Sequence, residues 1–322
     1  MLTRKRHVPS GLSVFAELPV QRVTVGAAGE WMAVHVAGRL GVGRLPLVCV
    51  PGYQRNMADF ADFQHNFDRV FGADWPVVLV DLKGRGRSAD RANKRQYVST
   101  VDAHELQQVC AALGIGRAVF LGQGYGGQTV MALAARAPLL VAGAVLIDAG
   151  PVSDPRGLVR LRNNLRELEG QRSAAGLRNM FRRILATDYP GLQDGMLDVL
   201  AARSHCLDDK GRVHALFDGH LIRMLEAFEH DDVLVAQWPL FNALSHTPLM
   251  MMRTQLTEQL RREVFEEMMR RRRDADAYII EGQASPALLN STADVAPIAE
   301  FMRQVLAGGQ RAAVQPALSA AP

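Results

Sequence analysis

The chain has 322 residues, of which 48% are hydrophobic and 22% charged, and this composition predicts one large globular core. Its net charge of +4 is too small to predict a surface for nucleic acid. The longest apolar stretch, residues 137–147, is shorter than the ~18 residues that a membrane span needs. Three widely spaced cysteines, and the lack of an apolar stretch behind the basic N-terminus, predict a cytoplasmic protein with reduced thiols and no metal site.

The first half of the chain alternates predicted strands with predicted helices. Residues 20–25 and 31–37 are rich in β-branched and aromatic side chains around a Gly-Ala-Ala-Gly turn, which predicts a hairpin. Continuous apolar runs, typical of strands buried in a parallel sheet, occur at residues 45–50, 76–81, 118–121 and 144–148. A loop and a helix are predicted over residues 56–71, with a core-facing stripe of Phe60, Phe63, Phe67 and Val70, and a second helix at 100–113. This alternation predicts a doubly wound, mostly parallel α/β sheet.

Residues 82–88, directly after one predicted strand, read Leu-Lys-Gly-Arg-Gly-Arg-Ser. Alternating glycines can hold a phosphate, but this spacing matches neither a P-loop nor a dinucleotide-binding fingerprint. We therefore expect no nucleotide and no other cofactor.

A second glycine-rich turn follows the predicted strand at 118–121, where residues 122–127 read Gly-Gln-Gly-Tyr-Gly-Gly before an alanine-rich helix. Glycines at alternate positions between a strand and a helix are typical of the nucleophile elbow, whose middle residue carries the attacking hydroxyl or thiol. Here the middle residue is Gly124, which has no side chain. The scaffold of a hydrolase is therefore predicted without its nucleophile.

The second half begins with a charged helical region and then returns to the strand and helix pattern. Helices are predicted at residues 158–169, 174–187, 192–206 and 220–230, and later at 257–273 and 292–306, with strands at 248–252 and 278–281. The Gly/Ala/Pro-rich end has almost no core residues, which predicts disorder. We expect a basic segment at 1–19, core at 20–150, a helical lid at 151–237, core at 238–306 and a disordered tail at 307–322.

Four motifs in this order resemble the α/β-hydrolase superfamily, in its bacterial esterase-like and C–C-bond hydrolase branch. They are Val-Pro-Gly-Tyr at 50–53, Asp-Leu-Lys-Gly-Arg-Gly-Arg-Ser at 81–88, the elbow at 122–127, and Leu-Ile-Asp-Ala-Gly-Pro at 146–151. The resemblance covers about residues 20–302. It implies an eight-stranded sheet with an inserted helical lid.

The resemblance also implies three positions for a catalytic triad. The serine position is Gly124, the acid position in Arg-Thr-Gln-Leu-Thr-Glu-Gln-Leu (253–260) is Glu258, and the histidine position in Gln-Ala-Ser-Pro-Ala-Leu (283–288) is Ala284. Glutamate is a tolerable acid, but glycine and alanine supply neither nucleophile nor base. Triad members act as a unit, so the loss of two predicts a site without serine-hydrolase chemistry.

The oxyanion hole of this family uses backbone N–H groups, which do not depend on the nucleophile. By resemblance these donors belong to Tyr53, after Gly52, and to Tyr125, after Gly124. These donors could still bind a carbonyl or carboxylate oxygen, so Gly52, Tyr53 and Tyr125 are candidate ligand contacts. The alternative is that the two tyrosine rings fill an emptied pocket. Both interpretations stay open at this point.

The sequence leaves three hypotheses about function. The first is a pseudoenzyme that binds a small carbonyl or carboxylate ligand, or a partner, without turnover. The second is an active hydrolase, lyase or isomerase that uses displaced residues, with Glu258 or Asp148 as the acid and a histidine of the predicted lid (His205, His214, His220 or His230) as the base. The third is a scaffold that forms a homodimer or pairs with an active relative. Fold alone cannot choose among them.

Overall fold

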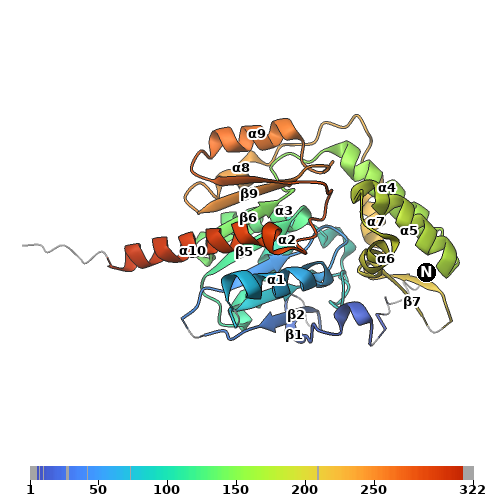
Figure 1. Ribbon diagram of the computed structural model, residues 1–322, viewed down its shortest axis with the longest axis horizontal. Helices are drawn as coiled ribbons and strands as arrows, with labels where there is room; N and C mark the ends of the chain where they lie inside the picture. Colours follow the sequence, from blue (N-terminus) through green and yellow to red (C-terminus); the bar gives the residue numbers. More distant parts are fainter. Residues whose placement is uncertain are drawn as a thin grey trace, which may run out of the picture.

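The computed structural model describes residues 6, 8–9, 11–26, 29–41, 43–72, 74–208 and 210–314, and its centre is one eight-stranded sheet (Figure 1). The strand order is β1-β2-β4-β3-β5-β6-β9-β10. The strands are β1 (Gln21–Thr24), β2 (Trp31–Ala37), β3 (Leu47–Val50), β4 (Val77–Val80), β5 (Ala118–Gln123), β6 (Val141–Ile147), β9 (Leu249–Thr254) and β10 (Asp276–Ile280). β1 and β2 pair antiparallel, as do β2 and β4, and the other pairs are parallel. The predicted hairpin and mostly parallel sheet are confirmed.

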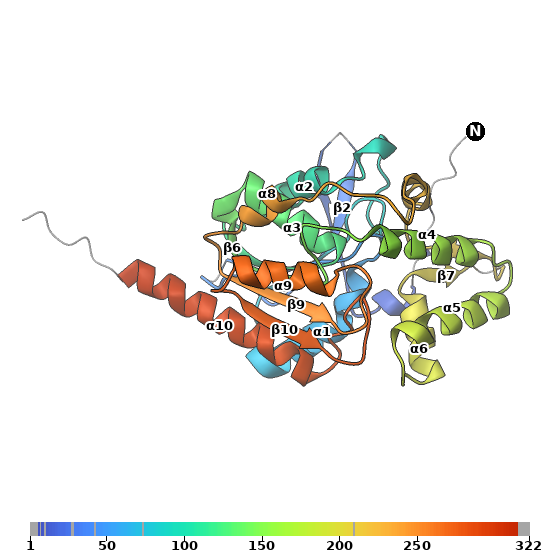
Figure 2. The same ribbon diagram turned by 90° about the horizontal axis from the view of Figure 1, so that it is seen from above.

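Helices cover both faces of the sheet, and each face has its own apolar core (Figures 1 and 2). One face packs on α1 (Ala61–Phe71) and α10 (Thr292–Val314). The other packs on α2 (Ser99–Ala112), α3 (Tyr125–Arg136), α8 (Trp238–Asn242) and α9 (Arg262–Arg271). The predicted stripe on the first helix is confirmed, since Phe60, Phe63 and Phe67 are fully buried and Val70 is partly buried.

Between β6 and α8 the chain forms an inserted segment, which lies at the end of the sheet where the parallel strands finish (Figures 1 and 2). Its elements are α4 (Pro155–Glu169), α5 (Ala174–Asp188), α6 (Asp194–Ala202), β7 (His205–Leu207), β8 (Val213–Ala215) and α7 (His220–Met224). Leu165, Phe181 and Leu221 belong to an apolar cluster of this segment. This placement sets the segment over the loops that carry the elbow.

Several predicted helix ends are wrong, and one of them has a clear local cause. The predicted helix 192–206 ends at Ala202, because residues 205–207 pair with residues 213–215 across a turn in which Asp208 accepts backbone N–H groups. The predicted helix 257–273 begins only at Arg262. The predicted helix 220–230 ends at Met224, followed by a short 3-10 turn, η5 (Leu225–Ala227).

The end of the chain also differs from the prediction. α10 continues to Val314, past the predicted end at residue 306, so the first part of the predicted tail is helical. Residues 315–322 of the predicted tail lie outside the described residues, as do residues 1–5, 7 and 10 of the predicted N-terminal segment. In the described ranges, no helix combines the length and apolar character needed to cross a membrane.

Candidate functional site

The turn between β5 and α3 has the sharp geometry of an elbow. Gly124 at its tip has φ 50° and ψ −116°, a region that residues with a side chain rarely adopt. Its N–H donates to the Ile147 carbonyl at 2.8 Å, which ties the turn to the end of β6. The first residue of α3 is therefore presented at the carboxyl ends of the central strands.

The neighbouring glycines are needed because helix and strand approach closely. A Cβ on Gly122 would lie 2.5 Å from the Cα of Gly127, and a Cβ on Gly126 would overlap the Val50 carbonyl oxygen. Both obstacles are backbone atoms, which cannot rotate away. The glycine spacing that the sequence shows is thus a packing requirement of this turn.

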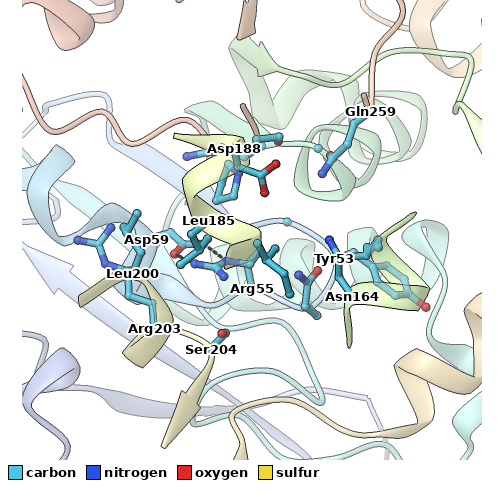
Figure 3. Close-up of a pocket in the computed structure, with 18 of the residues that line it drawn as sticks. Tyr53, Arg55, Asp59, Asn164, Leu185, Asp188, Leu200, Arg203, Ser204 and Gln259 are labelled. Atoms are coloured by element: carbon cyan, nitrogen blue, oxygen red, sulfur yellow. Dashed lines mark hydrogen bonds and ion pairs between the residues drawn. The ribbon is translucent and has the colours of Figure 1, made fainter. Parts of the chain in front are cut away.

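The space above Gly124 is filled by another residue, Gln259. A Cβ placed on Gly124 would lie 2.5 Å from the Gln259 Oε1, and apart from the two chain neighbours no other described residue comes within 4 Å of that position. Gln259 belongs to the loop after β9, and its side chain points toward the cavity beside the elbow (Figure 3). An amide therefore occupies the place into which a nucleophile's side chain would extend. No pattern in the sequence singles out this residue.

The other two triad-equivalent positions do not converge on Gly124. The Glu258 side chain is 52% exposed and pairs with Arg160 at 3.2 Å, at a surface cavity that Arg253 and Arg261 also line. Ala284 is buried, and its N–H donates to the Asp188 carbonyl at 2.8 Å. The structure thus brings no acid–base pair from these positions to the elbow.

The two predicted oxyanion residues do lie together at the elbow. The rings of Tyr53 and Tyr125 meet edge to face with centroids 5.4 Å apart. The Tyr53 hydroxyl donates to the Leu221 carbonyl at 3.1 Å, and the Tyr125 hydroxyl donates to the Asp102 carboxylate at 2.7 Å. Within the described ranges, neither backbone N–H donates a hydrogen bond to a protein group. Two backbone donors are therefore free for an oxygen atom of a ligand.

Arg85 contacts both tyrosines of this pair. Its Nε donates to the Tyr53 carbonyl at 2.7 Å, and its guanidinium lies 5.7 Å and 5.2 Å from the ring centroids of Tyr53 and Tyr125. Arg85 is fully buried, where such cation–π contacts are strongest. Burial raises the pKa of Tyr53 to about 12 and that of Tyr125 well above its usual value, so both phenols stay neutral. The tyrosines act here as neutral, well-anchored groups.

A cavity of about 110 Å³, which we call the polar cavity for its charged and amide side chains, opens on one side of Gly124, between the elbow and the inserted segment (Figure 3). Apolar side chains, among them Leu165, Phe181 and Leu185, also line it. Its lining includes Arg55, which pairs with Asp59, and Asn164, whose amide makes no hydrogen bond to the described residues. Gln123 also lines it and is 2% exposed. Its Nε2 donates to the Ala287 carbonyl at 3.2 Å, while its buried Oε1 has no partner in the described part of the chain. A buried acceptor without a donor is costly unless a ligand or water supplies one.

A larger cavity of about 340 Å³, which has both polar and apolar walls, opens on the other side of Gly124. Its apolar lining comes mostly from the inserted segment and includes Leu158, Met224, Leu225, Phe228 and Leu234, together with the ring of Tyr97. The two cavities share four lining residues, namely Tyr53, Gly124, Leu161 and Gln259. They therefore meet at the elbow tip.

Asp148 directly follows β6, the strand that pairs with the elbow strand β5. Its carboxylate lines the larger cavity. It is buried and has a φ of 50°, in the left-handed region. The Thr254 N–H and hydroxyl donate to its two oxygens at 2.8 Å and 2.7 Å. Burial raises its pKa to about 6, although hydrogen bonds from Thr254 and Ser285 oppose that effect.

The candidate replacement bases lie elsewhere. None of the histidines that the structure describes lines either cavity. His205 is buried between Phe181 and Phe217, its Nδ1 contacts the Ser204 hydroxyl at 3.0 Å, and burial lowers its pKa to about 3. Across the described ranges, no three His, Cys, Asp or Glu side chains are grouped to hold a metal ion.

Comparisons with known proteins agree with this geometry. A family model described as alpha/beta hydrolase fold matches residues 46–193. A 2-hydroxy-6-oxononadienedioate/2-hydroxy-6-oxononatrienedioate hydrolase of Burkholderia vietnamiensis is 34% identical over 40% of this chain and 44% of its own length. The protein of the same name from Paraburkholderia phymatum is 27% identical over 57% of this chain and 65% of its own length. The chain thus aligns with between 44% and 65% of these relatives.

Solved structures match over most of the chain. The crystal structure of an alpha/beta hydrolase from Novosphingobium aromaticivorans superposes with a TM-score of 0.77 at 26% identity, over 90% of this chain and 99% of that one. The structure of E-2-(acetamidomethylene)succinate hydrolase has a TM-score of 0.67 at 19% identity, over 90% and 98%, and this likeness concerns the fold alone.

Proposed function

Because the chain belongs to the α/β-hydrolase superfamily, we propose that it is a member that binds a small carbonyl or carboxylate compound without serine-hydrolase turnover. The observation that carries the proposal is the amide of Gln259, 2.5 Å from where a side chain at Gly124 would begin. Hydrolysis in this superfamily needs a hydroxyl at that point and an imidazole to remove its proton. The elbow has neither, since Ala284 stands at the histidine position.

The same geometry supports binding. The free N–H groups of Tyr53 and Tyr125 can donate to one ligand oxygen, as they would to an oxyanion. The orphaned Oε1 of Gln123 calls for a ligand hydroxyl or other donor, and Asn164 and Arg55 supply further polar contacts. Relatives named as hydrolases of 2-hydroxy-6-oxo dioates act on molecules with carboxylate and ketone groups, which supports the choice of ligand class.

The first test is chemical. Purified protein should neither hydrolyse p-nitrophenyl acetate above buffer nor react with a fluorophosphonate probe, because Gly124 offers no nucleophile. It should bind 2-oxobutyrate in a calorimetric titration, and Gln123→Leu and Asn164→Leu should each weaken that binding. Probe labelling that disappears in Ser204→Ala or Ser285→Ala, the hydroxyls that line the polar cavity, would contradict the proposal.

A second test is rescue of hydrolysis. Gly124→Ser together with Ala284→His should hydrolyse the ester faster than either single variant, because serine without a base is a poor nucleophile. Adding Gln259→Gly should increase the rate further by clearing the space above the elbow. If Gly124→Ser alone matches the double variant, a displaced base is already present and the proposal fails.

A second candidate function rests on Asp148. A buried carboxyl that lines the larger cavity and has a pKa near 6 can exchange a proton with a carbonyl compound at neutral pH, as lyase or isomerase chemistry requires. The test is deuterium uptake at the carbon next to the ketone of 2-oxo-6-phenylhexanoate, an acid long enough to reach that cavity, followed by NMR. Uptake faster than in buffer, and lost in Asp148→Asn, supports acid–base catalysis. Equal rates in buffer, wild type and variant exclude it.

A further inference from the structure

The two cavities beside the elbow have a common boundary. Tyr53, Gly124, Leu161 and Gln259 line both of them. Among these, Tyr53 is anchored through its carbonyl by Arg85 and through its hydroxyl to the Leu221 carbonyl. Gly124 has no side chain. Gln259 is therefore the polar residue at this boundary whose side chain is able to change its rotamer.

Within the described residues, the hydrogen bonds that hold Gln259 come from its backbone and from the loop around it. Its N–H donates to the Thr257 hydroxyl at 3.1 Å, and the loop around it is folded on Arg253, whose guanidinium donates to the carbonyls of Thr254, Gln255, Thr257 and Leu260. In the described part of the chain, the Gln259 amide makes no side-chain hydrogen bond, and the residue is exposed. A glutamine on an anchored loop with a free amide can change rotamer at little cost.

Apolar side chains line both compartments, and the two differ in which polar and charged groups they contain. The side with Arg55, Asn164 and the orphaned Gln123 Oε1 suits a charged or hydroxylated group. The side with Leu158, Met224 and Phe228 suits a hydrocarbon or aromatic body. A ligand that uses both sides must pass over Gly124, where the Gln259 amide now lies.

We propose that Gln259 is a gate that divides one ligand site into a polar and an apolar compartment, and that it swings off Gly124 to admit an elongated amphipathic acid. This inference rests on the proposed binding function. Because Gly124 lacks a Cβ, the open gate would leave a continuous path along the elbow tip. Short acids that fit the polar side do not need the gate to move.

The test compares two acids by calorimetric titration. The short probe is 2-oxobutyrate and the long probe is 2-oxo-6-phenylhexanoate. Gln259→Ala should bind the long acid about tenfold more tightly than wild type and the short acid within twofold of wild type. Gln255→Ala makes the same chemical change in the same loop, but the Gln255 Oε1 faces the Gly282 N–H, so it should alter neither affinity selectively. Equal changes for both acids, or no change for the long one, would overturn the gate.

A ligand-free measurement separates the gate from the binding function. In Gly124→Cys the new thiol lies at the boundary, and it should react with iodoacetamide at least fivefold faster when Gln259→Ala is added. The three native cysteines are buried, so they give a slow background that the parent chain measures directly. If neither acid binds any variant, the binding proposal fails, and this rate ratio still decides the gate: a ratio near one overturns it.

Discussion

The elbow turn and the loops after β9 and β10 differ in what they keep of the α/β-hydrolase pattern. The turn keeps its backbone in full, with Gly124 at φ 50° and the N–H groups of Tyr53 and Tyr125 free for a ligand. The loops place Glu258 at the surface and Ala284 in a buried position against the Asp188 carbonyl, so neither presents an acid or a base to the elbow. The turn is needed for packing whether or not chemistry occurs, whereas the side chains of a triad serve only chemistry.

The elbow therefore has two kinds of position, which substitution should separate. At Gly122 and Gly126 an added Cβ meets backbone atoms, and at Gly127 it meets the Cβ of Ala149. At Gly124 it meets only the flexible end of a glutamine. Substitution at Gly122, Gly126 or Gly127 should lower stability strongly, whereas substitution at Gly124 should lower it weakly.

The largest effect is expected for Gly126→Ala. Its methyl group would overlap the Val50 carbonyl oxygen, so β3 and α3 must move apart and disturb the centre of the sheet. We expect a loss of about 4 kcal/mol in the free energy of unfolding, or failure to fold, as for the most damaging core substitutions. Urea unfolding followed by circular dichroism measures it.

Gly195→Ala is the matched control, because Gly195 is exposed on α6 and an added Cβ would have no neighbour within 4 Å. It should raise stability by up to about 1 kcal/mol through helix propensity. Similar results for the two variants would show that the elbow is not constrained by packing.

A smaller effect concerns pH and the carboxyl after β6. Burial raises the pKa of Asp148 to about 6 from the ordinary 3.8, so folding favours its protonated form. Its contribution to stability is therefore complete below pH 4 and is lost as the pH rises through about 6. A shift of two pK units corresponds to at most about 3 kcal/mol. Asp148→Asn should lack this loss, since its amide mimics the neutral acid and asparagine tolerates a positive φ.

Unfolding free energies of wild type and Asp148→Asn at pH 4, 5, 6 and 7 check this. The variant should gain stability relative to wild type as the pH rises across that range. A constant difference would mean that Asp148 titrates normally in the folded protein. Asp81 is also buried with a pKa raised to about 6, and it stays unchanged in both proteins, so its contribution cancels.

The sheet and the elbow could be predicted from the sequence because their residues are forced by local geometry. Continuous apolar runs mark strands that are buried on both faces, and alternating glycines mark a turn where any Cβ collides. The hairpin β7–β8 could not be predicted in this way. Residues 205 and 206 fall within the predicted helix 192–206, and the pairing of β7 with β8 depends on a turn in which Asp208 accepts backbone N–H groups.

The position of Gln259 could not be predicted for a similar reason. A glutamine in a loop is not part of any periodic pattern, and the resemblance assigns a role only to its neighbour Glu258. The loop that carries both residues is held by Arg253, whose guanidinium donates to four of its carbonyls. That arrangement depends on three-dimensional contacts, so the sequence shows the elbow and its missing hydroxyl but not the amide that covers it.

The smallest effect is expected for Gly124→Ser, which tests the backbone of the elbow itself. A residue with a side chain at φ 50° and ψ −116° costs on the order of 1 to 3 kcal/mol. Glycine in turn loses about 0.5 to 1 kcal/mol more conformational entropy on folding than alanine does, which offsets part of that cost. The net loss of stability should therefore be about 1 kcal/mol, measured by the midpoint of reversible denaturant unfolding.

The Gln259 amide adds a separable part to this loss. If its Oε1 obstructs the new side chain, Gly124→Ser should cost less in a Gln259→Ala background than in wild type, because the obstacle 2.5 Å from the Cβ is gone. The part that remains in that background is backbone strain alone. A midpoint that is unchanged or raised in both backgrounds would show that the turn is not strained, and Gly124 would then lose its physical claim to the position of the nucleophile.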